Sequence, residues 1–412
     1  MADLSVPRLG LANPFIIAAS PATQGVYAVL KSAAVRPGAV VMRNYRHAAG
    51  GGTLLSPSAA DMRAGRHATQ SHALGTQMRD AFNSHQEYYE GVAQARRQMP
   101  AEVKLWVSVG HFADTITPGV DWKKDWTEQA VELERAGADA LEVHFNTPGV
   151  AVAGDRVHDF YRLIYNTTRM VKGVTHLPVM VKLPLESTDP LRAMEAAWHA
   201  GADAVGPTAR WKAFVFELDW RRSLAQPGGG YGGTQALPII CYAVAEARLQ
   251  GIDIPMYAGG GVFSWEAAAK LIMAGSDAVQ LGSLACCLGP GAVQNLMQGF
   301  SLWMDQAGHP DVASLRGEAL SLLTMPAEVA EERRRRLGAA YRQAGVREQL
   351  CDGCGYCADA CWYDAIHVKD GKAAKTAKCI GCGYCFQVCP TGALYLPEAG
   401  DIVASVFHSQ GS

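Results

Sequence analysis

Short apolar runs alternate with longer amphipathic segments from about Asn13 to Ala285. The runs have the length of buried strands, and the segments between them carry apolar residues at helical spacing. The predicted strands are Pro14–Ser20, Ala39–Asn44, Val103–Val109, Ala140–Phe145, Val179–Leu183, Ala204–Thr208, Pro255–Gly259 and Ala278–Leu281. The predicted helices include Asp125–Ala136, His158–Lys172, Leu191–Ala200 and Trp265–Ala274. Strand followed by helix, repeated about eight times, predicts an α/β fold of the (β/α)8 TIM barrel type.

A recurring phrase of Gly, a small residue and Asp supports this prediction. It occurs in Ala136–Ala140, Ala200–Ala204 and Ala274–Ala278. Glycine is favoured directly after the end of a helix, so each phrase predicts a helix that ends there and a strand that follows at once.

Two long segments interrupt the alternation, Arg46–Thr76 after the second predicted strand and Lys212–Gly233 after the sixth. Long loops are usually either functional or disordered. Both segments follow the carboxyl ends of strands, which is where barrel enzymes build their active sites, and this position favours function.

The chain of 412 residues is long enough for two or three domains. We expect an FMN-binding barrel in residues 1–325, a charged helical linker in 326–345, a ferredoxin-like domain in 346–400 and a C-terminal tail in 401–412. The basic run Arg333–Arg336 is interpreted as a solvated face or a domain contact and not as a docking site.

Charge and hydropathy exclude several classes of partner. A formal net charge of -2 indicates neither nucleic-acid binding nor an anionic membrane surface. The start MADLSVPRLG has no basic and apolar signal-peptide pattern, and no apolar run reaches the roughly 18 residues of a membrane span. We therefore expect a cytoplasmic protein.

Two cysteine runs near the C-terminus, each of the form CxxCxxCxxxC, predict two [4Fe–4S] clusters in a bacterial-type ferredoxin domain. The expected ligands are Cys351, Cys354, Cys357, Cys361, Cys379, Cys382, Cys385 and Cys389. In such pairs the last cysteine of each run usually completes the other cluster, so Cys389 would complete the first and Cys361 the second. Zinc and disulfides are the alternatives, but zinc sites favour separate CxxC pairs. Trp362 stands where the first run would normally have proline.

Glycine-rich turns follow the last two predicted barrel strands, at Gly259–Val262 and at Gly282–Ser283. Such turns let backbone N–H groups approach a phosphate, and barrels often bind phosphate at this position. The cofactor that connects one-electron clusters with two-electron chemistry is a flavin. A barrel phosphate site favours FMN over FAD, and no GxGxxG that would indicate an NAD(P) site follows a strand.

Several motifs resemble the dihydroorotate/dihydropyrimidine dehydrogenase family. They are Asn13–Phe15, Ala18–Thr23, Ser56–Pro57, Asp125–Glu128, Gly137–Val143, Val181–Pro184 and Tyr231–Gly233. The order of barrel and ferredoxin domain resembles the FMN and iron–sulfur portion, the C-terminal half, of dihydropyrimidine dehydrogenase. These motifs are specific for the scaffold and for FMN, and much less so for the substrate.

The resemblance implies a set of FMN-binding residues. They are Ala19, Ser20, Arg43, Lys182, Thr208, Gly232, Gly233, Gly260, Gly261, Gly282 and Ser283. Ala19 and Ser20 would lie against the flavin, and Lys182 would reach the flavin or its ribityl oxygens. A buried lysine without a partner is costly, which favours a functional role over a structural one. Arg43 replaces the family's lysine, so the positive charge is kept with a changed geometry.

The substrate pattern of the family is altered. His144 stands where the family has a substrate-binding asparagine, Thr147 replaces the catalytic cysteine, and Arg210 follows the sixth strand where the family has an amide pattern. Another substrate asparagine would fall within His72–Gln77. The losses argue against a pyrimidine ring, whereas histidine and arginine favour an anionic or carbonyl-bearing substrate. The alternative for Arg210 is a salt bridge on the barrel rim.

A proton donor is still required. His144 titrates in a suitable range and is the first candidate, and His111, after the third strand, is the second. Threonine is a poor acid, so Thr147 would need a relay. For each of the two histidines, the alternative to a catalytic role is a structural one.

The sequence thus predicts an oxidoreductase acting on CH–CH groups, with electrons relayed to or from an external partner. That partner would be a ferredoxin or an NAD(P)H-oxidising flavoprotein subunit, and a homodimer is compatible with the resemblance. One alternative is a dihydropyrimidine dehydrogenase subunit proper. Another is a non-catalytic electron-transfer module.

Overall fold

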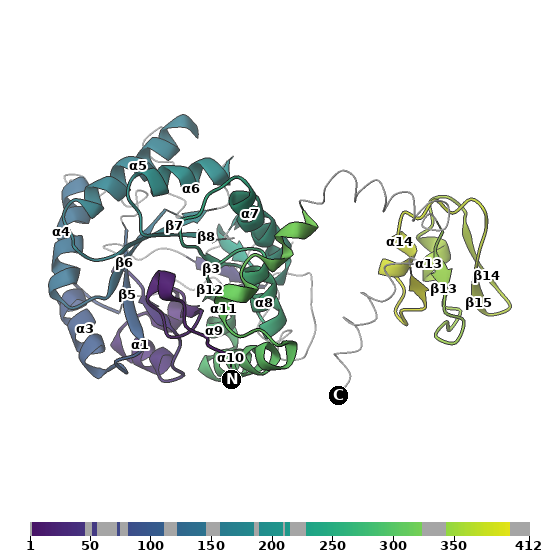
Figure 1. The fold of residues 1–412 in the computed structure, drawn as a ribbon, viewed down its shortest axis with the longest axis horizontal. Helices are drawn as coiled ribbons and strands as arrows, with labels where there is room; N and C mark the ends of the chain where they lie inside the picture. The colour runs from purple at the N-terminus through teal and green to yellow at the C-terminus, as the bar shows by residue number, and fades with distance from the viewer. Residues whose placement is uncertain are drawn as a thin grey trace, which may run out of the picture. The chain divides into compact units, whose positions relative to one another are not determined.

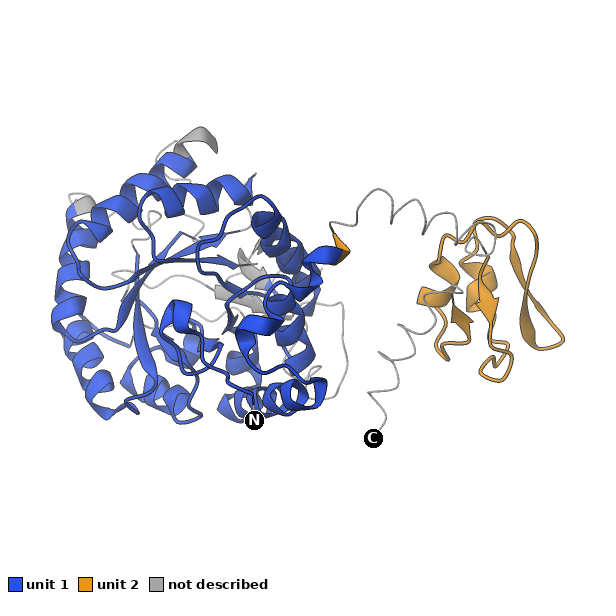
Figure 2. Cartoon of the chain, viewed as in Figure 1, with its two compact units in different colours: residues 1–321 blue, residues 322–412 orange. Residues whose placement is uncertain are grey.

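The structure is a computed structural model of the chain. It describes residues 2–45, 52–55, 72–74, 81–110, 122–145, 157–184, 189–208, 211–214, 228–323 and 343–395. The chain divides into two compact units, Met1–Ser321 and Leu322–Ser412 (Figure 2). This division lies close to the boundary predicted at residue 325, while most of the predicted linker and the predicted tail lie outside the described residues.

The first unit confirms the predicted barrel. Eight parallel strands close in the order β1-β12-β11-β8-β7-β6-β5-β2, with the helices in a ring outside them (Figure 1). The barrel strands are β1 (Phe15–Ile17), β2 (Ala39–Met42), β5 (Lys104–Val109), β6 (Ala140–His144), β7 (Val179–Pro184), β8 (Ala204–Thr208), β11 (Tyr257–Gly259) and β12 (Ala278–Leu281). Each lies within or beside its predicted apolar run, because strands covered on both faces are apolar throughout.

The helices follow the predicted alternation. Those of the first unit are α1 (Val26–Ala33), α3 (His85–Gln98), α4 (Trp122–Arg135), α5 (Val157–Lys172), α6 (Pro190–His199), α7 (Leu237–Leu249), α8 (Trp265–Met273), α9 (Ser283–Leu288), α10 (Pro290–Ala307) and α11 (Val312–Leu315). Short 3-10 helices are η1 (Pro7–Leu9), η2 (Pro21–Thr23), η6 (Thr234–Ala236) and η7 (Glu318–Leu322). None of the helices in the described part of the chain is long and apolar enough to cross a membrane.

The two long interruptions contain strands that the sequence did not predict. They form a second sheet in the order β4-β3-β10-β9, from β3 (Gly52–Leu55), β4 (His72–Leu74), β9 (Trp211–Phe214) and β10 (Gly228–Gly232). β3, from the first interruption, pairs in parallel with β10, from the second. Segments that follow two different barrel strands are therefore joined by backbone hydrogen bonds.

The recurring Gly–Asp phrase has a second function besides ending helices. The three glycines adopt positive φ, as expected for helix ends: Gly137 at 90°, Gly201 at 91° and Gly275 at 116°. Each aspartate two residues later accepts the backbone N–H at the start of the neighbouring strand and pairs with a base from the helix before that strand. The sets are Asp139 with Leu105 and Arg96, Asp203 with Val179 and Lys172, and Asp277 with Met256 and Arg248.

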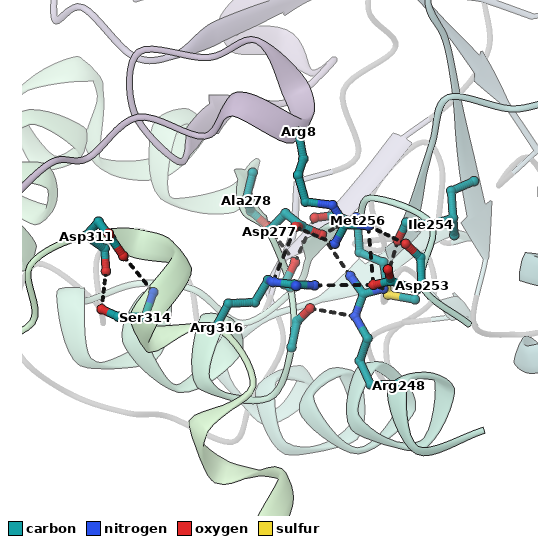
Figure 3. Close-up of polar contacts among 12 residues, drawn as sticks. Arg8, Arg248, Asp253, Ile254, Met256, Asp277, Ala278, Asp311, Ser314 and Arg316 are labelled. Atoms are coloured by element: carbon teal, nitrogen blue, oxygen red, sulfur yellow. Dashed lines mark hydrogen bonds and ion pairs between the residues drawn. The ribbon is translucent and has the colours of Figure 1, made fainter. Parts of the chain in front are cut away.

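The Asp277 set is the most extensive of the three (Figure 3). Its carboxylate accepts from Arg248 Nη2 at 2.7 Å and from Arg8 Nη1 at 3.0 Å, and Arg316 Nε lies 3.6 Å away. Burial lowers the pKa of Arg248 to about 10, so its guanidinium is still charged at neutral pH. Arg8 precedes the first barrel strand, and Arg316 follows α11, the last α-helix of the first unit. The buried carboxylate of Asp277, directly before β12, therefore binds the chain both before and after the barrel.

The second unit is small and internally repetitive. It contains the hairpin of β14 (Ile366–Lys369) and β15 (Lys372–Lys375), the antiparallel pair of β13 (Gly345–Val346) and β16 (Leu394–Tyr395), and the short helices α13 (Tyr356–Asp359) and α14 (Tyr384–Gln387). Its core consists of a few apolar residues and the cysteines themselves. Such a core is too small to fold without help, which is typical of domains stabilised by metal groups.

Asp277→Asn is expected to destabilise the barrel by about 3–5 kcal/mol, because it removes the buried counter-charge of the buried Arg248 guanidinium. The matched control is Asp253→Asn, which touches the same arginines from a side chain that is 73% exposed. That change should cost less than about 1 kcal/mol. Urea unfolding followed by far-UV circular dichroism measures both, and equal losses would contradict the fastening role of Asp277.

Candidate active site and cluster-binding cysteines

His144 and Lys182 lie side by side at the carboxyl end of the barrel. His144 ends β6, Lys182 belongs to β7, and the two residues are register partners on adjacent parallel strands. Both are nearly buried, with 9% and 5% exposure. Gly110, just after β5, lies next to the imidazole, since a Cβ there would be in van der Waals contact with His144 Nδ1 at 3.4 Å.

A buried carboxylate lies one step below this pair. Glu142 of β6 is completely buried, and its Oε1 lies 3.7 Å from Lys182 Nζ. Its Oε2 accepts a hydrogen bond of 2.6 Å from Gln280 Nε2 of β12. Three strands separate β6 from β12 in the barrel order, so this bond crosses the interior. The interior of the barrel is therefore polar and charged at this level, not filled by aliphatic side chains alone.

Tyr257 of β11 completes the inner cluster. Its ring packs edge-on against Trp106 of β5 at a centroid distance of 5.3 Å. Gly206 of β8 is required for this arrangement, because a Cβ there would lie 2.5 Å from the tyrosine ring. Burial, and after it the charge of Glu142, raises the pKa of Tyr257 well above its usual value. The phenol therefore stays neutral beside the carboxylate.

The turn after β1 brings together three of the residues predicted to bind cofactor, Ala19, Ser20 and Arg43. Ser20 caps η2, accepting from the backbone N–H of Ala22 at 3.2 Å. The backbone N–H of Arg43 donates to Thr23 O at 3.2 Å, which joins the end of β2 to this turn. Arg43 Nη1 also donates to Gln24 Oε1 at 2.7 Å, so its guanidinium is held against the turn.

Two of the predicted phosphate-binding turns meet at the N-terminus of α7. Gly233 precedes η6, which leads directly into α7, and Gly261 follows β11 with φ of 75°. A Cβ on Gly261 would lie only 2.5 Å from Leu237 N, the first residue of α7. Gly260 has φ of 134°, which also favours glycine. Backbone N–H groups of two chain segments thus gather at the positive end of a thirteen-residue helix.

The third turn lies beside the first strand. Gly282 and Ser283 begin α9, and a Cβ on Gly282 would meet only Ala18 Cβ at 3.7 Å. Ala18 N donates to Leu281 O at 3.0 Å, so the ends of β1 and β12 are joined. Thr208 ends β8, where its Oγ1 donates to Gly206 O at 3.0 Å. Gly232 ends β10.

Three of the four predicted catalytic residues, Thr147, His111 and Arg210, lie outside the described residues. His72–Gln77 is described only as the backbone of β4, His72–Leu74. Of the predicted catalytic set, His144 alone can be placed, and it lies beside Lys182.

The described donors fit an FMN molecule. Glycine turns at the starts of α7 and α9 offer backbone N–H groups suited to a phosphate. A buried ammonium, Lys182, and the turn that contains Ser20 are polar groups at the carboxyl end of the same barrel. This is the chemistry that a ribityl phosphate and the polar edge of a flavin require.

The second unit brings its cysteines together in two groups of four that cross between the runs. One hollow is lined by Cys351, Cys354, Cys357 and Cys389. The other is lined by Cys379, Cys382, Cys385 and Cys361. This is the exchange of the last cysteine that the spacing predicts.

Backbone N–H groups point at three of the sulfur atoms. Ala373, Ala365 and Ala344 donate to Cys351, Cys361 and Cys379, each at 3.3 Å. Such bonds stabilise negative charge on sulfur and set cluster potential. Within the described residues, no three His, Cys, Asp or Glu side chains converge closely enough to hold a single metal ion. Four cysteines spaced around a hollow suit a cubane cluster better than zinc.

Trp362, which takes the place of the proline, is 89% exposed. The substitution therefore leaves the cysteine arrangement around both hollows intact.

Sequence reasoning assigned no role to Glu142, Gln280 and Tyr257. Glu142 could have been found, because it is the one charged residue within the apolar run Ala140–Phe145 apart from His144 at its end. A charged residue within a strand buried on both faces is rare unless it has a partner. Gln280 could not have been linked to it, because the two lie 138 residues apart.

Two family models match the chain, one in each of its two compact units. The Dihydroorotate dehydrogenase family model matches residues 1–304, and the 4Fe-4S dicluster domain model matches residues 350–393. Since the first match covers most of the chain, the chain belongs to the dihydroorotate dehydrogenase family, with a dicluster domain after the barrel.

Among curated relatives, the chain is similar to proteins named dihydroorotate dehydrogenase B (NAD(+)), catalytic subunit. The protein from Pyrococcus abyssi is 30% identical over 198 residues, which are 47% of this chain and 66% of the relative. The protein from Pyrococcus furiosus is 30% identical over 191 residues, 46% of this chain and 63% of the relative. The match thus spans slightly less than two thirds of each relative.

Replacement of Cys389 by serine is expected to impair the group bound by Cys351, Cys354 and Cys357, which belong to the other run. Cys361→Ser should instead impair the group bound by the second run. Each variant, reconstituted anaerobically, should lose about half of its iron and sulfide, because one of two clusters loses a ligand. Electron paramagnetic resonance of the remaining cluster identifies which is lost. Loss of the cluster of the same run would refute the crossed arrangement.

Proposed function

We propose that the chain is an oxidoreductase that uses FMN in the barrel and two [4Fe–4S] clusters in the second unit. FMN supplies hydride exchange with an organic substrate and single-electron exchange with clusters. The eight cysteines of the second unit would hold the clusters. Thiolates that must stay reduced until clusters assemble favour a cytoplasmic location.

The observation that carries the proposal is the pairing of His144 with Lys182 at the carboxyl end of the barrel. A cationic side chain and a titratable one, both nearly buried, lie on adjacent strands at the end where barrel enzymes work. Lys182 would contact the flavin or its ribityl chain. His144 would face the substrate on the same rim.

The balance of the reaction assigns a role to His144. Saturation of a C=C bond requires a hydride at one carbon and a proton at its neighbour, while two electrons reach the barrel one at a time. His144 would donate that proton, and it would accept it again in the reverse direction. Thr147 and His111 remain proposed members of the same site, with His111 as the second candidate donor.

The substrate class follows from the side chains that replace the family's amides. Asparagine matches the alternating donors and acceptors of a pyrimidine edge, whereas His144 and Arg210 do not. A compound with a carboxylate or carbonyl next to the C=C bond would satisfy both residues. Arg210 would bind the carboxylate with two parallel hydrogen bonds.

The partner would be a separate redox protein. The curated relatives are catalytic subunits, which supports an electron-transfer partner such as an NAD(P)H-oxidising flavoprotein subunit, with a ferredoxin as the other candidate. Association into a homodimer is compatible with either partner.

A second candidate function is that of a dihydroorotate or dihydropyrimidine dehydrogenase subunit proper. The names of the curated relatives favour it for dihydroorotate, and the order of barrel and dicluster domain favours it for dihydropyrimidine. The altered residues around His144 count against both substrates.

An anaerobic reoxidation experiment tests the proposal. The reconstituted chain is reduced with dithionite and mixed with unsaturated carboxylates, unsaturated carbonyl compounds, orotate and pyrimidines, while flavin absorbance is followed. We expect an anionic or carbonyl-bearing compound without a pyrimidine ring to reoxidise the flavin. Reoxidation by orotate or a pyrimidine alone would support the second candidate. No reoxidation by any compound, with cofactors loaded, would indicate a relay module.

His144→Asn, which restores the family's residue, should slow that reoxidation by about 10²-fold or more, because the proton donor is lost. Reduction of the clusters should be unchanged. The matched control is His199→Asn, on the exposed side of α6, where no effect is expected. Equal rates in His144→Asn and wild type would remove His144 from the site.

A further inference from the structure

We propose that Glu142 is a positioning residue, which acts through Lys182 by holding its ammonium group charged and in a fixed place at the site proposed for the flavin. This inference rests on the proposed function, because it assigns Lys182 to the flavin. No part of the family comparison or of the sequence motifs assigns a role to this carboxylate.

The geometry of the carboxylate leaves it one charged partner among the described residues. Glu142 Oε1 lies 3.7 Å from Lys182 Nζ, and both side chains are buried, at 0% and 6% exposure. Oε2 is occupied by Gln280 Nε2 at 2.6 Å. Since a neutral amide holds one oxygen, the other oxygen is directed to the lysine.

The walls of the barrel prevent the carboxylate from turning away. The cross-barrel bond to Gln280 fixes one oxygen, and Gly259 admits Gln280, since a Cβ there would lie 3.1 Å from Gln280 Cβ. Tyr257 fills the space that Gly206 leaves open. The carboxylate is therefore held rigidly by neutral groups and can offset only the charge on Lys182.

The other titratable groups near this pair are few in the described part of the barrel. His144 lies above Glu142 on β6, Tyr257 faces it from β11, and Arg43 follows β2. The tyrosine stays neutral because burial raises its pKa. Arg43 is bound to Gln24. The described side chains of β1, β5, β7, β8 and β12 add no further titratable group beyond Lys182 and Lys104, the latter at the opposite, amino end of β5.

Retention of this pair has no ready explanation in stability. Moving two charges out of water is costly, and buried ion pairs are often no more stabilising than apolar side chains of similar size. Removal of one partner alone is much worse, since the remaining charge is then unpaired. A pair of this kind at the carboxyl end of a barrel is best explained by a need for a charged lysine at a fixed place.

Glu142→Gln keeps the shape of the side chain and removes its charge, so it tests the proposal. The pKa of Lys182 should fall, because its buried ammonium loses the charge of the carboxylate 3.7 Å away. At low pH the lysine is still charged, so the FMN midpoint potential should be more positive than in wild type. As pH rises through the lowered pKa, the lysine becomes neutral and this difference should vanish. A plot of the FMN midpoint potential of Glu142→Gln against pH should therefore change slope at the lowered pKa of Lys182, a break that wild type lacks.

Two comparisons separate this effect from a structural one. The double change Glu142→Gln with Lys182→Met should show no break, because no titrating group is left in the pair. The matched control is Glu134→Gln, which removes a carboxylate that binds Thr175 Oγ1 at 2.6 Å and His176 N at 3.1 Å outside the barrel interior. It should lower stability without adding a break.

Stability of the flavin-free protein gives a second measurement. In Glu142→Gln the folded pKa of Lys182 lies below its unfolded value, so unfolding takes up protons between the two. The loss of stability relative to wild type should therefore be largest at low pH and shrink as pH rises. The double variant should regain much of that loss, because both charges of the buried pair are removed together.

Each outcome decides the proposal. A potential that follows the wild-type pH profile, with a pH-independent loss of stability, would overturn it. If Glu142→Gln fails to fold and the double variant folds, the coupling is supported; if both fail alike, Glu142 is structural and the proposal is wrong. If wild type binds no FMN, the proposed function fails instead, and the flavin-free comparison still decides whether Glu142 controls Lys182.

Discussion

The barrel depends on one repeated interaction, in which a carboxylate just before one strand binds the backbone of the preceding strand and a base from the helix before that preceding strand. Asp139, Asp203 and Asp277 make this contact at the amino ends of three strands. It fixes each strand pair in register at that end, and the carboxylates are occupied by these structural bonds. At the opposite end of the barrel, glycines lie at the ends of β11 and β12, at Gly259 and Gly282, and such glycines let a ligand approach backbone N–H groups. Stability and chemistry are thus separated to the two ends of the same strands.

The charged interior is an exception to that division. Glu142 lies inside the barrel, where most TIM barrels have branched apolar side chains. A buried carboxylate requires a hydrogen-bond donor, and Gln280 is that donor. It also requires space, which the glycines on β8 and β11 leave open. Three strands are thus adapted to one carboxylate on a fourth. Since an ion pair of this kind contributes little net stability, the adaptation is better understood as the support of Lys182.

Most of the fold could be predicted from the sequence because parallel strands covered on both faces form continuous apolar runs. The crossed cysteine groups could be predicted because their spacing already determines which sulfur atoms share a hollow. β10 could not, because Gly228–Gly232 has almost no side chains that favour a strand, and its partner β3 lies in a distant segment. Arg43 was placed correctly at the end of β2, but its bond to Gln24 depends on a turn that no local pattern reveals.

The second sheet joins the segment where the chain departs from the family's substrate pattern to the segment that carries the glycine turns. β4 contains the start of His72–Gln77, where a substrate-binding residue is expected, and β10 ends at Gly232, beside the phosphate turns. β3 pairs with both of them. Because backbone hydrogen bonds fix register, the substrate segment is held at a set distance from the cofactor segment whatever its side chains are. Side chains in this region, such as His144, can then differ from the family's pattern without a change in the backbone that we propose binds FMN.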